Sequence, residues 1–367
     1  MQNFVQKILK IFSRQEGSVL GVDIGSSSIK VVELRKKKGK AVLVTYGELA
    51  LGPYSELEIG RATNLPSEKL AVAVVDLLRE ANASTKNCGV AIPVGSSLIT
   101  LIDFPPVSEK ELPTMVPIEA KKYIPVPISE VALNWRVVPK ETSELYTDEA
   151  HKDRLQVLVV AIHNEVLSRY QDIIKKSGLE STFIEIEIFS TIRAVLDQGT
   201  GTVMIFDLGA SSTKLYIVER GVVHSSHTVN RGSQDVTSAL STSLGVTIAE
   251  AEAIKRSFGS AKRENEKQVF ETISLSMEYI FYEANRVLLD YERKYNKNVS
   301  KVIMTGGGVG YTGLIELAKM NIQTEVVLGN PFAKVEFPAF LDDILRHTGP
   351  EFSVAVGVAL RKLQELE

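Results

Sequence analysis

The chain has 367 residues, of which 44% are apolar and 24% are charged, and its formal net charge at pH 7 is -3. A single hydrophobic core seldom organises so many residues, so we expect two or three domains, and the small negative charge excludes a global attraction to nucleic acid. The apolar runs are too short for a membrane span, and the lone cysteine, Cys88, cannot form an internal disulfide. These features predict a cytoplasmic protein without a nucleic-acid partner.

Residues 1–17 are predicted to form an amphipathic N-terminal segment, and Lys7 and Lys10 interrupt the apolar run that a signal peptide would need. One helical stripe carries the large apolar side chains: Phe4, Val5, Ile8, Leu9, Ile11 and Phe12. This stripe either lies on an anionic membrane surface or docks on the protein itself or a partner helix. The basic run RKKKGK at 35–40 predicts a solvated hairpin turn, with attraction to a membrane as the alternative.

An octet of similar sequence occurs twice, as DIGSSSIK from Asp23 to Lys30 and as DLGASSTK from Asp207 to Lys214. Each copy follows one apolar, β-branched run and precedes another, so each predicts a β-hairpin. Backbone N–H groups of such a turn bind phosphate, a carboxylate at the strand end can hold Mg²⁺ through water, and a lysine adds positive charge. One copy could be a plain turn, but two predict a bilobed protein that clamps the phosphates of ATP from opposite sides.

A third glycine-rich turn follows the predicted strand that ends at Thr305, and it leads into a helix from about Gly313 to Met320. Three consecutive glycines there allow the backbone to approach a ligand closely. Before it, Thr247 and Glu250 form a capping box that predicts the start of a helix. That helix carries Glu252 and Lys255, which either contact adenosine or belong to a solvated face. The chain's prolines concentrate between residues 105 and 139, where they predict only short helical pieces.

Together these segments resemble the actin-like ATPase superfamily and, within it, the PilM family of type IV pilus assembly proteins. The narrower resemblance runs from about Val19 to Lys362, and its most specific stretch is YIPVPISEVALNW from Tyr123. It implies an α/β, actin-like (ribonuclease H-like) bilobed fold with duplicated mixed-sheet domains. It also implies an inserted α+β subdomain of the SHS2 type, called 1C, as in FtsA.

The resemblance also implies where the chain divides into subdomains. After the amphipathic segment, subdomain 1A takes residues 18–97 with 179–198 and 350–367. Subdomain 1C takes residues 98–178, and subdomain 2A takes residues 199–245 with 300–349. Subdomain 2B takes residues 246–299.

Site residues follow from the same resemblance. The phosphate loops are assigned to Asp23, Gly25, Ser26, Ser27, Ser28 and Lys30, and to Asp207, Gly209, Ala210, Ser211 and Ser212. The adenosine side is assigned to Glu252, Lys255, Gly306, Gly307 and Gly308. Asp23 and Asp207 are the expected Mg²⁺ ligands, and with Glu187 they are the candidate catalytic residues. As a general base Glu187 would lie near the attacking water, whereas in a strand IEIEIF it would face solvent.

Two departures from the family pattern concern Lys214, where relatives commonly have a hydroxyl residue, and Leu275, where they commonly have a basic one. They lead us to expect ATP binding with at most slow hydrolysis. The implied function is a cytoplasmic ATP-binding scaffold at the inner face of the cytoplasmic membrane, active in pilus assembly and twitching motility. A catalytically active actin-like ATPase or kinase, or an FtsA-like polymerising cell-division protein, are the alternatives.

The expected partners are the N-terminal cytoplasmic peptide of PilN, other pilus platform or motor proteins, and a peripheral membrane contact. The resemblance implies that the PilN peptide lies in a groove between 1A and 1C. Two segments are candidates for that groove, Ser96 to Phe104 and Lys121 to Ile128, and both are equally compatible with ordinary strand and core.

Overall fold

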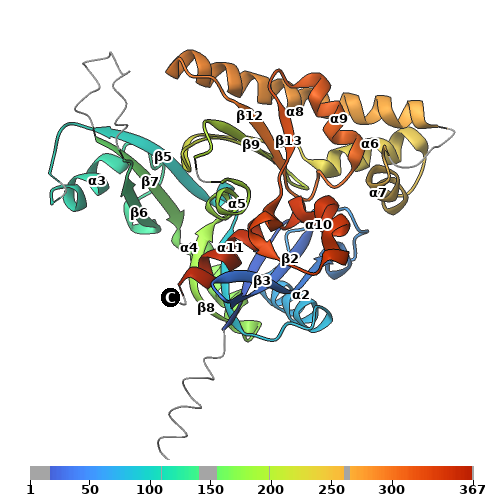
Figure 1. Ribbon diagram of the computed structural model, residues 1–367, viewed down its shortest axis with the longest axis horizontal. Coiled ribbons are helices and arrows are strands. Elements are labelled where there is room, and N and C mark those ends of the chain that lie inside the picture. The colour runs from blue at the N-terminus through green and yellow to red at the C-terminus, as the bar shows by residue number, and fades with distance from the viewer. Residues whose placement is uncertain (1–16, 109, 140–154, 198, 260–264, 366–367) are drawn as a thin grey trace, which may run out of the picture.

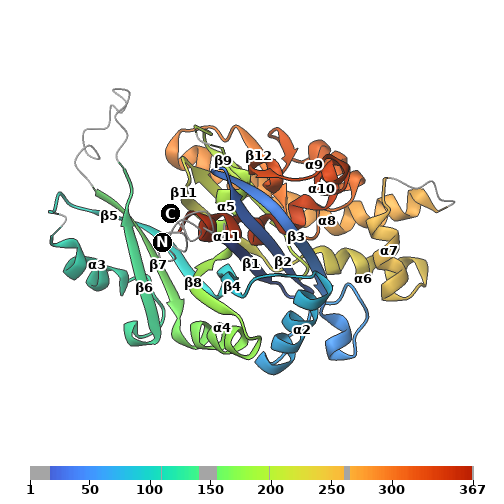
Figure 2. The ribbon, with the colours of Figure 1, turned by 60° about the horizontal axis from the view of Figure 1, so that its bottom comes forward.

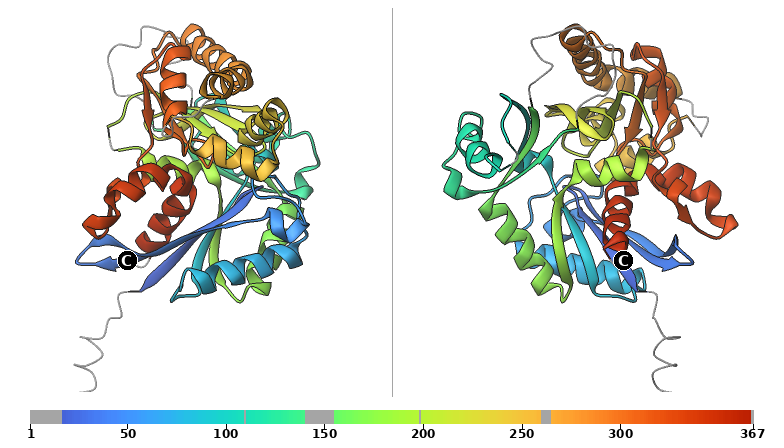
Figure 3. Two further views of the ribbon diagram at one scale, coloured as in Figure 1. Left: turned by 90° about the vertical axis from the view of Figure 1, so that its right-hand side faces the viewer. Right: turned by 60° about the vertical axis from the view of Figure 1, so that its left-hand side comes forward.

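The computed structural model describes residues 17–108, 110–139, 155–197, 199–259 and 265–365, which form two lobes and a smaller inserted subdomain at one side (Figure 1). The amphipathic segment predicted for residues 1–17 lies, apart from Gly17, outside these ranges. Figure 3 shows the two lobes one above the other and the inserted subdomain beside them.

The first lobe is built on a six-stranded sheet of order β14-β3-β2-β1-β4-β8. Strand β1 pairs antiparallel with β2 and parallel with β4, so the first octet forms the predicted hairpin. β-Branched side chains buried on both faces favour these central strands. The strand bounds are β1 (Ser18–Ile24), β2 (Ser28–Lys37), β3 (Lys40–Ala50), β4 (Asn87–Ile92), β8 (Glu180–Ile186) and β14 (Val335–Glu336).

The second lobe repeats this arrangement in a five-stranded sheet of order β11-β10-β9-β12-β13. Strand β9 pairs antiparallel with β10 and parallel with β12, as β1 does with β2 and β4. The duplication predicted from the two octets is therefore confirmed at the level of strand order and direction. The strand bounds are β9 (Val203–Leu208), β10 (Thr213–Glu219), β11 (Val222–Val229), β12 (Lys301–Thr305) and β13 (Val326–Leu328).

The inserted subdomain is an antiparallel sheet of order β5-β7-β6 with one short helix, so it has the predicted α+β composition. Its elements are β5 (Ser97–Phe104), α3 (Leu112–Ala120), β6 (Val131–Val137) and β7 (Leu155–His163). Pro117 stands inside α3, which ends three residues later, as the proline content predicts. Strand β5 passes next to β11 of the second lobe. The exact subdomain boundaries stay a prediction.

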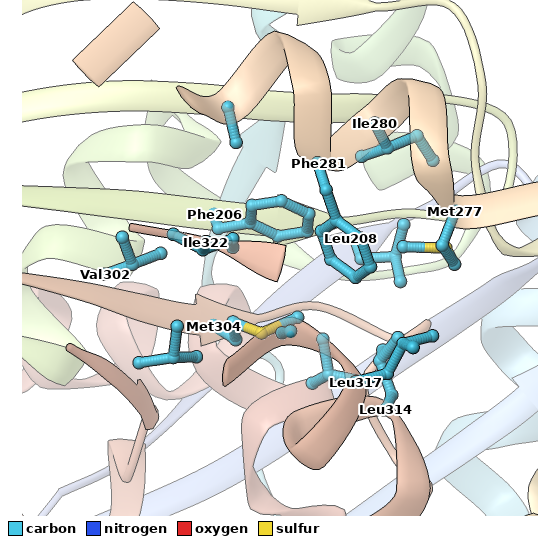
Figure 4. Close-up of a cluster of buried hydrophobic side chains, with 14 of the residues drawn as sticks. Phe206, Leu208, Met277, Ile280, Phe281, Val302, Met304, Leu314, Leu317 and Ile322 are labelled. Atoms are coloured by element: carbon cyan, nitrogen blue, oxygen red, sulfur yellow. The ribbon is translucent and has the colours of Figure 1, made fainter. Parts of the chain in front are cut away.

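Helices cover both faces of each large sheet. In the first lobe α2 (Ser67–Glu80) and α4 (Asn164–Lys176) pack together on one face (Figure 2), and α11 (Ser353–Gln364) packs on the other. In the second lobe one face of the sheet packs on α6 (Ser233–Leu244), α8 (Glu266–Tyr295) and α9 (Thr312–Asn321). Figure 4 shows this core, in which Phe206 of β9 meets Phe281 of α8 with ring centroids 6.2 Å apart.

The two lobes meet at a pair of central helices, α5 (Glu187–Val195) and α11. A Cβ added to Gly357 of α11 would lie 1.9 Å from the carbonyl oxygen of Ser190, so only glycine permits this approach. Ile188 of α5 belongs to a core that includes Leu20 of the first sheet and Ile205 of the second. Among the described residues, no helix combines the length and apolar character that crossing a membrane requires.

Candidate functional site

The two octets form turns of the same geometry that face one another between the lobes. In the first turn the Gly25 N–H donates to the Ser28 carbonyl at 3.0 Å, and in the second the Gly209 N–H donates to the Ser212 carbonyl at 3.0 Å. A Cβ on either glycine would lie 2.9 Å from that same oxygen. The hydroxyls of Ser26 and Ser211 are 3.2 Å apart, so the turns touch across the cleft.

A cavity of about 330 Å³ lies between these turns, at the lower end of the size range of small-molecule sites. Nearly all residues predicted to bind the cofactor line it: Asp23, Gly25, Ser26, Ser27, Ser28, Lys30, Asp207, Gly209, Ala210, Ser211, Ser212, Glu252, Lys255, Gly306 and Gly307. Gly308 is not among the lining residues. Its N–H donates to the Leu208 carbonyl at 2.8 Å, and an added Cβ would lie 2.5 Å from the Leu208 side chain. Gly308 therefore serves the packing of the turn.

The aspartate and lysine of each octet are cross-strand neighbours, Asp23 with Lys30 and Asp207 with Lys214. Lys30 and Asp207 are buried, whereas Asp23 and Lys214 are half-buried, and all four line the cavity. Burial raises the pKa of Asp23 to about 7, and nearby Glu187 and Asp207 add to the rise against the opposing effect of Lys30 and Lys214. Burial likewise raises the pKa of Asp207. Both aspartates therefore lie where negative charge is costly.

The two lysines of the octets pair differently. The Lys30 ammonium is 3.0 Å from Glu48 Oε1 and donates to the Ser28 hydroxyl at 2.8 Å. The Lys214 ammonium is 3.2 Å from Glu187 Oε1 and 3.5 Å from Asp207 Oδ2. Burial lowers the pKa of both lysines, but their carboxylate neighbours outweigh it and raise both pKa values. Both ammonium groups therefore stay charged within the site.

Glu187 is the first residue of α5 and is buried, so the alternative that it faces solvent from a strand is wrong. Its Oε1 accepts the Val94 N–H at 2.9 Å, besides its ion pair with Lys214. Residues 184–186 do form the end of β8, so the strand exists but ends three residues earlier than the expected IEIEIF strand of residues 184–189. The helix begins at Glu187 because α5 turns away from the sheet to pack on α11.

The third glycine turn follows β12, where Thr305 is the cross-strand neighbour of Asp207. Gly306 has φ 96°, a left-handed conformation that favours glycine, and an added Cβ would lie 2.3 Å from Asp207 Oδ1. At Gly307 an added Cβ would lie 3.5 Å from the Lys30 ammonium. The predicted close approach of this backbone to the site therefore exists at these two residues.

Glu252 and Lys255 are buried in α7 (Ile248–Arg256), so the alternative that they belong to a solvated face is wrong. Their charged atoms are 2.6 Å apart, and Lys255 also donates to the Thr237 hydroxyl at 2.9 Å. The predicted capping box at Thr247 opens this helix. Burial lowers the pKa of Lys255, and the ion pair with Glu252 opposes that effect.

Several further charged or polar residues that we did not predict line the cavity: Glu48, Thr191, Ser233, Arg256, Thr305, Glu351 and Ser353. Glu48 could have been found, because it is the cross-strand neighbour of Lys30 on β3. No motif in the sequence indicated that Glu351 would line the cavity. Burial raises the pKa of Glu351 to about 7, and neighbouring Glu48 adds to the rise. Leu275, whose departure from the family pattern we noted, is exposed on α8 and does not line the cavity.

The connection between β3 and α2 crosses from the first lobe to the second. Glu58 accepts the Ala249 N–H at 2.8 Å, and the Ala62 N–H donates to Gln234 Oε1 at 3.1 Å. Between them, Gly60 lies against the Glu252 side chain and lines the cavity. This connection therefore encloses one side of the site and ties the lobes together.

A second cavity, of about 170 Å³, lies between the first sheet, α2 and α4, next to the start of β5. Its wall includes Gly25 and Ser26, which also line the first cavity. The other lining residues are mostly apolar: Ile24, Leu51, Thr63, Asn64, Leu65, Leu70, Pro93, Ser96, Val166, Arg169 and Tyr170. The two cavities thus share one turn as a common wall.

The predicted Mg²⁺ ligands do not form an evident metal site. Within the part of the chain that the structure describes, no group of three or more His, Cys, Asp or Glu side chains is placed to hold a metal ion. Lys214 pairs with Asp207, and Glu187 takes part in the same cluster. Because the Lys214 ammonium lies 3.2 Å from Glu187 and 3.5 Å from Asp207, this donor set does not fit a Mg²⁺ ion bound directly between the two carboxylates.

Comparison with known proteins agrees with this architecture. The family model for type IV pilus assembly protein PilM matches residues 21–363. The solved PilM-PilN type IV pilus biogenesis complex is similar with a TM-score of 0.78 and 23% identity, over 95% of this chain and 99% of that chain. MreB 5 of Spiroplasma citri bound to AMPPNP is similar with a TM-score of 0.53 and 12% identity, over 96% and 98% of the two chains.

Among curated proteins, cell division protein FtsA of Bacillus subtilis (strain 168) is 23% identical over 257 residues. That match takes in 62% of this chain and 58% of FtsA, less than two thirds of the relative's length. The structural likenesses confirm the predicted actin-like bilobed fold.

Proposed function

Since this chain belongs to the PilM family of type IV pilus assembly proteins, we propose that it is an ATP-binding scaffold of the inner-membrane assembly complex of the pilus. The observation that carries the nucleotide site is the pairing of two equivalent turns across one cavity, with the Ser26 and Ser211 hydroxyls 3.2 Å apart. Turn N–H groups and hydroxyls bind phosphate oxygens, and ammonium groups strengthen that binding. The cavity offers all three to one polyphosphate.

In this proposal ATP is a ligand that holds the lobes together, and it is turned over slowly if at all. A general base needs free access to the proton of the attacking water. Glu187, the candidate base, has both carboxylate oxygens within 3.3 Å of the Lys214 ammonium and accepts the Val94 N–H at 2.9 Å. These contacts support retention of the nucleotide over hydrolysis.

The proposed site of the PilN N-terminal tail is the second cavity and the adjoining start of β5. Its apolar wall suits side chains of an extended peptide, and Arg169, which donates to the Leu65 carbonyl at 2.7 Å, contributes a guanidinium group to the same wall. Of the two segments considered beforehand, the one from Ser96 begins at this cavity, whereas Ile124 of the other is in the core of the inserted subdomain. The PilN-PilM pairing itself is taken from the similar complex.

The shared wall gives a route for coupling. Gly25 and Ser26 line both cavities, so a peptide that binds better to one position of this turn changes the affinity for nucleotide by the same factor as nucleotide changes the affinity for peptide. The nucleotide thereby acts as an allosteric ligand of the scaffold.

The proposal includes a position at the inner face of the cytoplasmic membrane and contacts with other platform or motor proteins. The basic turn at 35–40 is one candidate for the membrane side, because Lys37 and Lys38 are exposed at its tip. Charge reversal of Lys37 and Lys38 should weaken binding to vesicles that contain anionic lipid. Unchanged binding removes this turn from the proposal.

The test of the scaffold is calorimetry of ATP, followed by titration of a synthetic PilN N-terminal peptide into the empty and the ATP-loaded protein. We expect ATP to bind the wild type and not Gly209→Val, whose added Cβ would lie 2.9 Å from the Ser212 carbonyl oxygen. Gly201→Val is the matched control, because an added Cβ there meets nothing within 4 Å. The peptide should bind more tightly to one of the two forms.

Normal ATP binding by Gly209→Val would exclude this cavity as the nucleotide site, and failure of the peptide to bind either form would remove the PilN assignment. Steady-state phosphate release separates the scaffold from an active ATPase or kinase. Sedimentation with ATP separates both from an FtsA-like polymer former.

A further inference from the structure

Lys214 lies beside Asp207, one of the two aspartates that the sequence assigned to Mg²⁺, and beside the candidate general base Glu187. Its ammonium nitrogen is 3.2 Å from Oε1 and 3.3 Å from Oε2 of Glu187, and 3.5 Å from Oδ2 of Asp207. Only 15% of its side chain is exposed, so water offers this ammonium group few other partners. Lys214 therefore joins the two carboxylates as a fixed monovalent cation.

A divalent ion would compete with Lys214 for the same oxygen atoms. Mg²⁺ demands a nearly octahedral shell of oxygen ligands, and an ammonium group inside that shell repels it. Glu187 Oε1 is further occupied by the Val94 N–H at 2.9 Å. Binding Mg²⁺ between Glu187 and Asp207 would thus require Lys214 to leave.

The lysine of the first hairpin has a different arrangement. Lys30 is 3.0 Å from Glu48, and its ammonium nitrogen would lie 3.5 Å from a Cβ added to Gly307. The cavity therefore has one ammonium group behind each phosphate turn. Together with the turn N–H groups and the serine hydroxyls, they can neutralise phosphate oxygens directly.

We propose that the Lys214 ammonium takes the place of the divalent cation, so that this chain binds the polyphosphate of a nucleotide without Mg²⁺. This inference rests on the proposed nucleotide site and adds which form of the nucleotide the site accepts. Lys214 is then the residue that makes the site specific for the metal-free nucleotide. It acts by pairing with Glu187 and Asp207, whose oxygen atoms a hydrated metal ion would need.

The decisive experiment needs no variant. ATP is titrated into the wild-type protein in the calorimeter, once with excess Mg²⁺ and once with excess EDTA. We expect the two Kd values to agree within about threefold, since the fixed cation is present in both cases. An affinity that falls about tenfold or more in EDTA overturns the inference.

The variant Lys214→Thr should make ATP binding depend on Mg²⁺, because threonine leaves Glu187 and Asp207 without their positively charged partner. This variant should lose about tenfold or more of its ATP affinity in EDTA and regain it with Mg²⁺. Without nucleotide, Mg²⁺ should raise the unfolding temperature of Lys214→Thr and leave that of the wild type unchanged. A variant that is as independent of Mg²⁺ as the wild type contradicts the assigned role of Lys214.

Lys30→Thr is the matched control, since it changes the same position of the other octet, where the lysine pairs with Glu48. It should weaken ATP binding equally with Mg²⁺ and with EDTA. ATP that binds the wild type only with Mg²⁺ defeats this inference and leaves the scaffold intact, whereas no binding under either condition defeats both. If Lys214→Thr does not fold, the two wild-type titrations decide alone.

Discussion

The two hairpins share sequence, register and turn geometry, yet their lysines turn to different partners. In the first hairpin the neighbour of Lys30 on the third strand is Glu48, and the two form an ion pair at 3.0 Å. In the second hairpin the neighbour of Lys214 on the third strand is Thr228, which offers no charge. Lys214 therefore reaches Glu187 and Asp207. The comparison indicates that the octet determines the geometry of the turn. The residue opposite the lysine on the adjacent strand influences which carboxylate the lysine pairs with.

The largest effect should come from deleting the second lysine. Lys214→Met leaves Glu187 and Asp207 buried without their cation, and breaking a buried pair in this way typically costs about 3 kcal/mol or more. Urea unfolding of the unliganded protein in EDTA measures this loss. Lys267→Met, on a lysine whose side chain is 91% exposed, should change the free energy of unfolding by less than about 0.5 kcal/mol. Equal effects of the two substitutions would contradict a stabilising role for the Lys214 pairs.

Near the first hairpin, the buried carboxyl group of Glu351 makes stability depend on pH. Burial raises the pKa of Glu351 to about 7, with Glu48 adding to the rise while Lys30 and Arg256 oppose it. Because this folded-state pKa lies above the ordinary glutamate pKa of 4.5, the contribution of Glu351 to stability is complete below pH 4.5 and is lost as the pH rises through 7.

Glu351→Gln removes that loss, so its free energy of unfolding relative to wild type should rise by up to about 3 kcal/mol between pH 5 and pH 8. Unfolding in urea at the two pH values gives the difference directly. Glu316→Gln, an exposed glutamate on α9, is the control and should show no such slope. A constant difference for Glu351→Gln would mean that its carboxyl group is not protonated in the folded state.

Exchanging the residues that lie opposite Lys214 and Lys30 on the third strand of each hairpin should change which carboxylates the two lysines pair with. Thr228→Glu gives Lys214 the acidic neighbour that Lys30 has, draws it away from Glu187 and should make ATP binding depend on Mg²⁺ by about fivefold. Glu48→Thr should release Lys30 toward the cavity and raise ATP affinity in EDTA by a similar factor of about five. Calorimetry of both variants with and without Mg²⁺ tests the pair. No change in either would show that the neighbouring strand does not control the lysines.

The smallest effect should come from the contact between the turns. The Ser26 and Ser211 hydroxyls are 3.2 Å apart at an exposed position, where water replaces a lost hydrogen bond. Ser26→Ala, Ser211→Ala and the double variant should therefore show a coupling of at most about 0.5 kcal/mol in unfolding free energy. A much larger coupling would mean that the turns are locked together before any nucleotide binds.

Local chemistry explains which features were predictable from sequence. Each octet hairpin and the capping box at Thr247 depends on residues a few positions apart, and each forms as expected. The acidic partner of Lys30 could have been inferred from strand register. The partners of Lys214, by contrast, depend on how α5 docks against the second sheet, and Glu351 reaches the cavity only because α11 packs on β1. No local pattern encodes those long-range contacts.

The contact of Gly357 with Ser190 fixes how closely the two central helices approach each other. At this point the backbones of α5 and α11 meet, and the Arg193 side chain of α5 donates to the Gly357 carbonyl at 2.9 Å. A side chain larger than hydrogen at position 357 would therefore push α5 away from α11, and the core that Ile188 of α5 shares with both large sheets would lose its close packing.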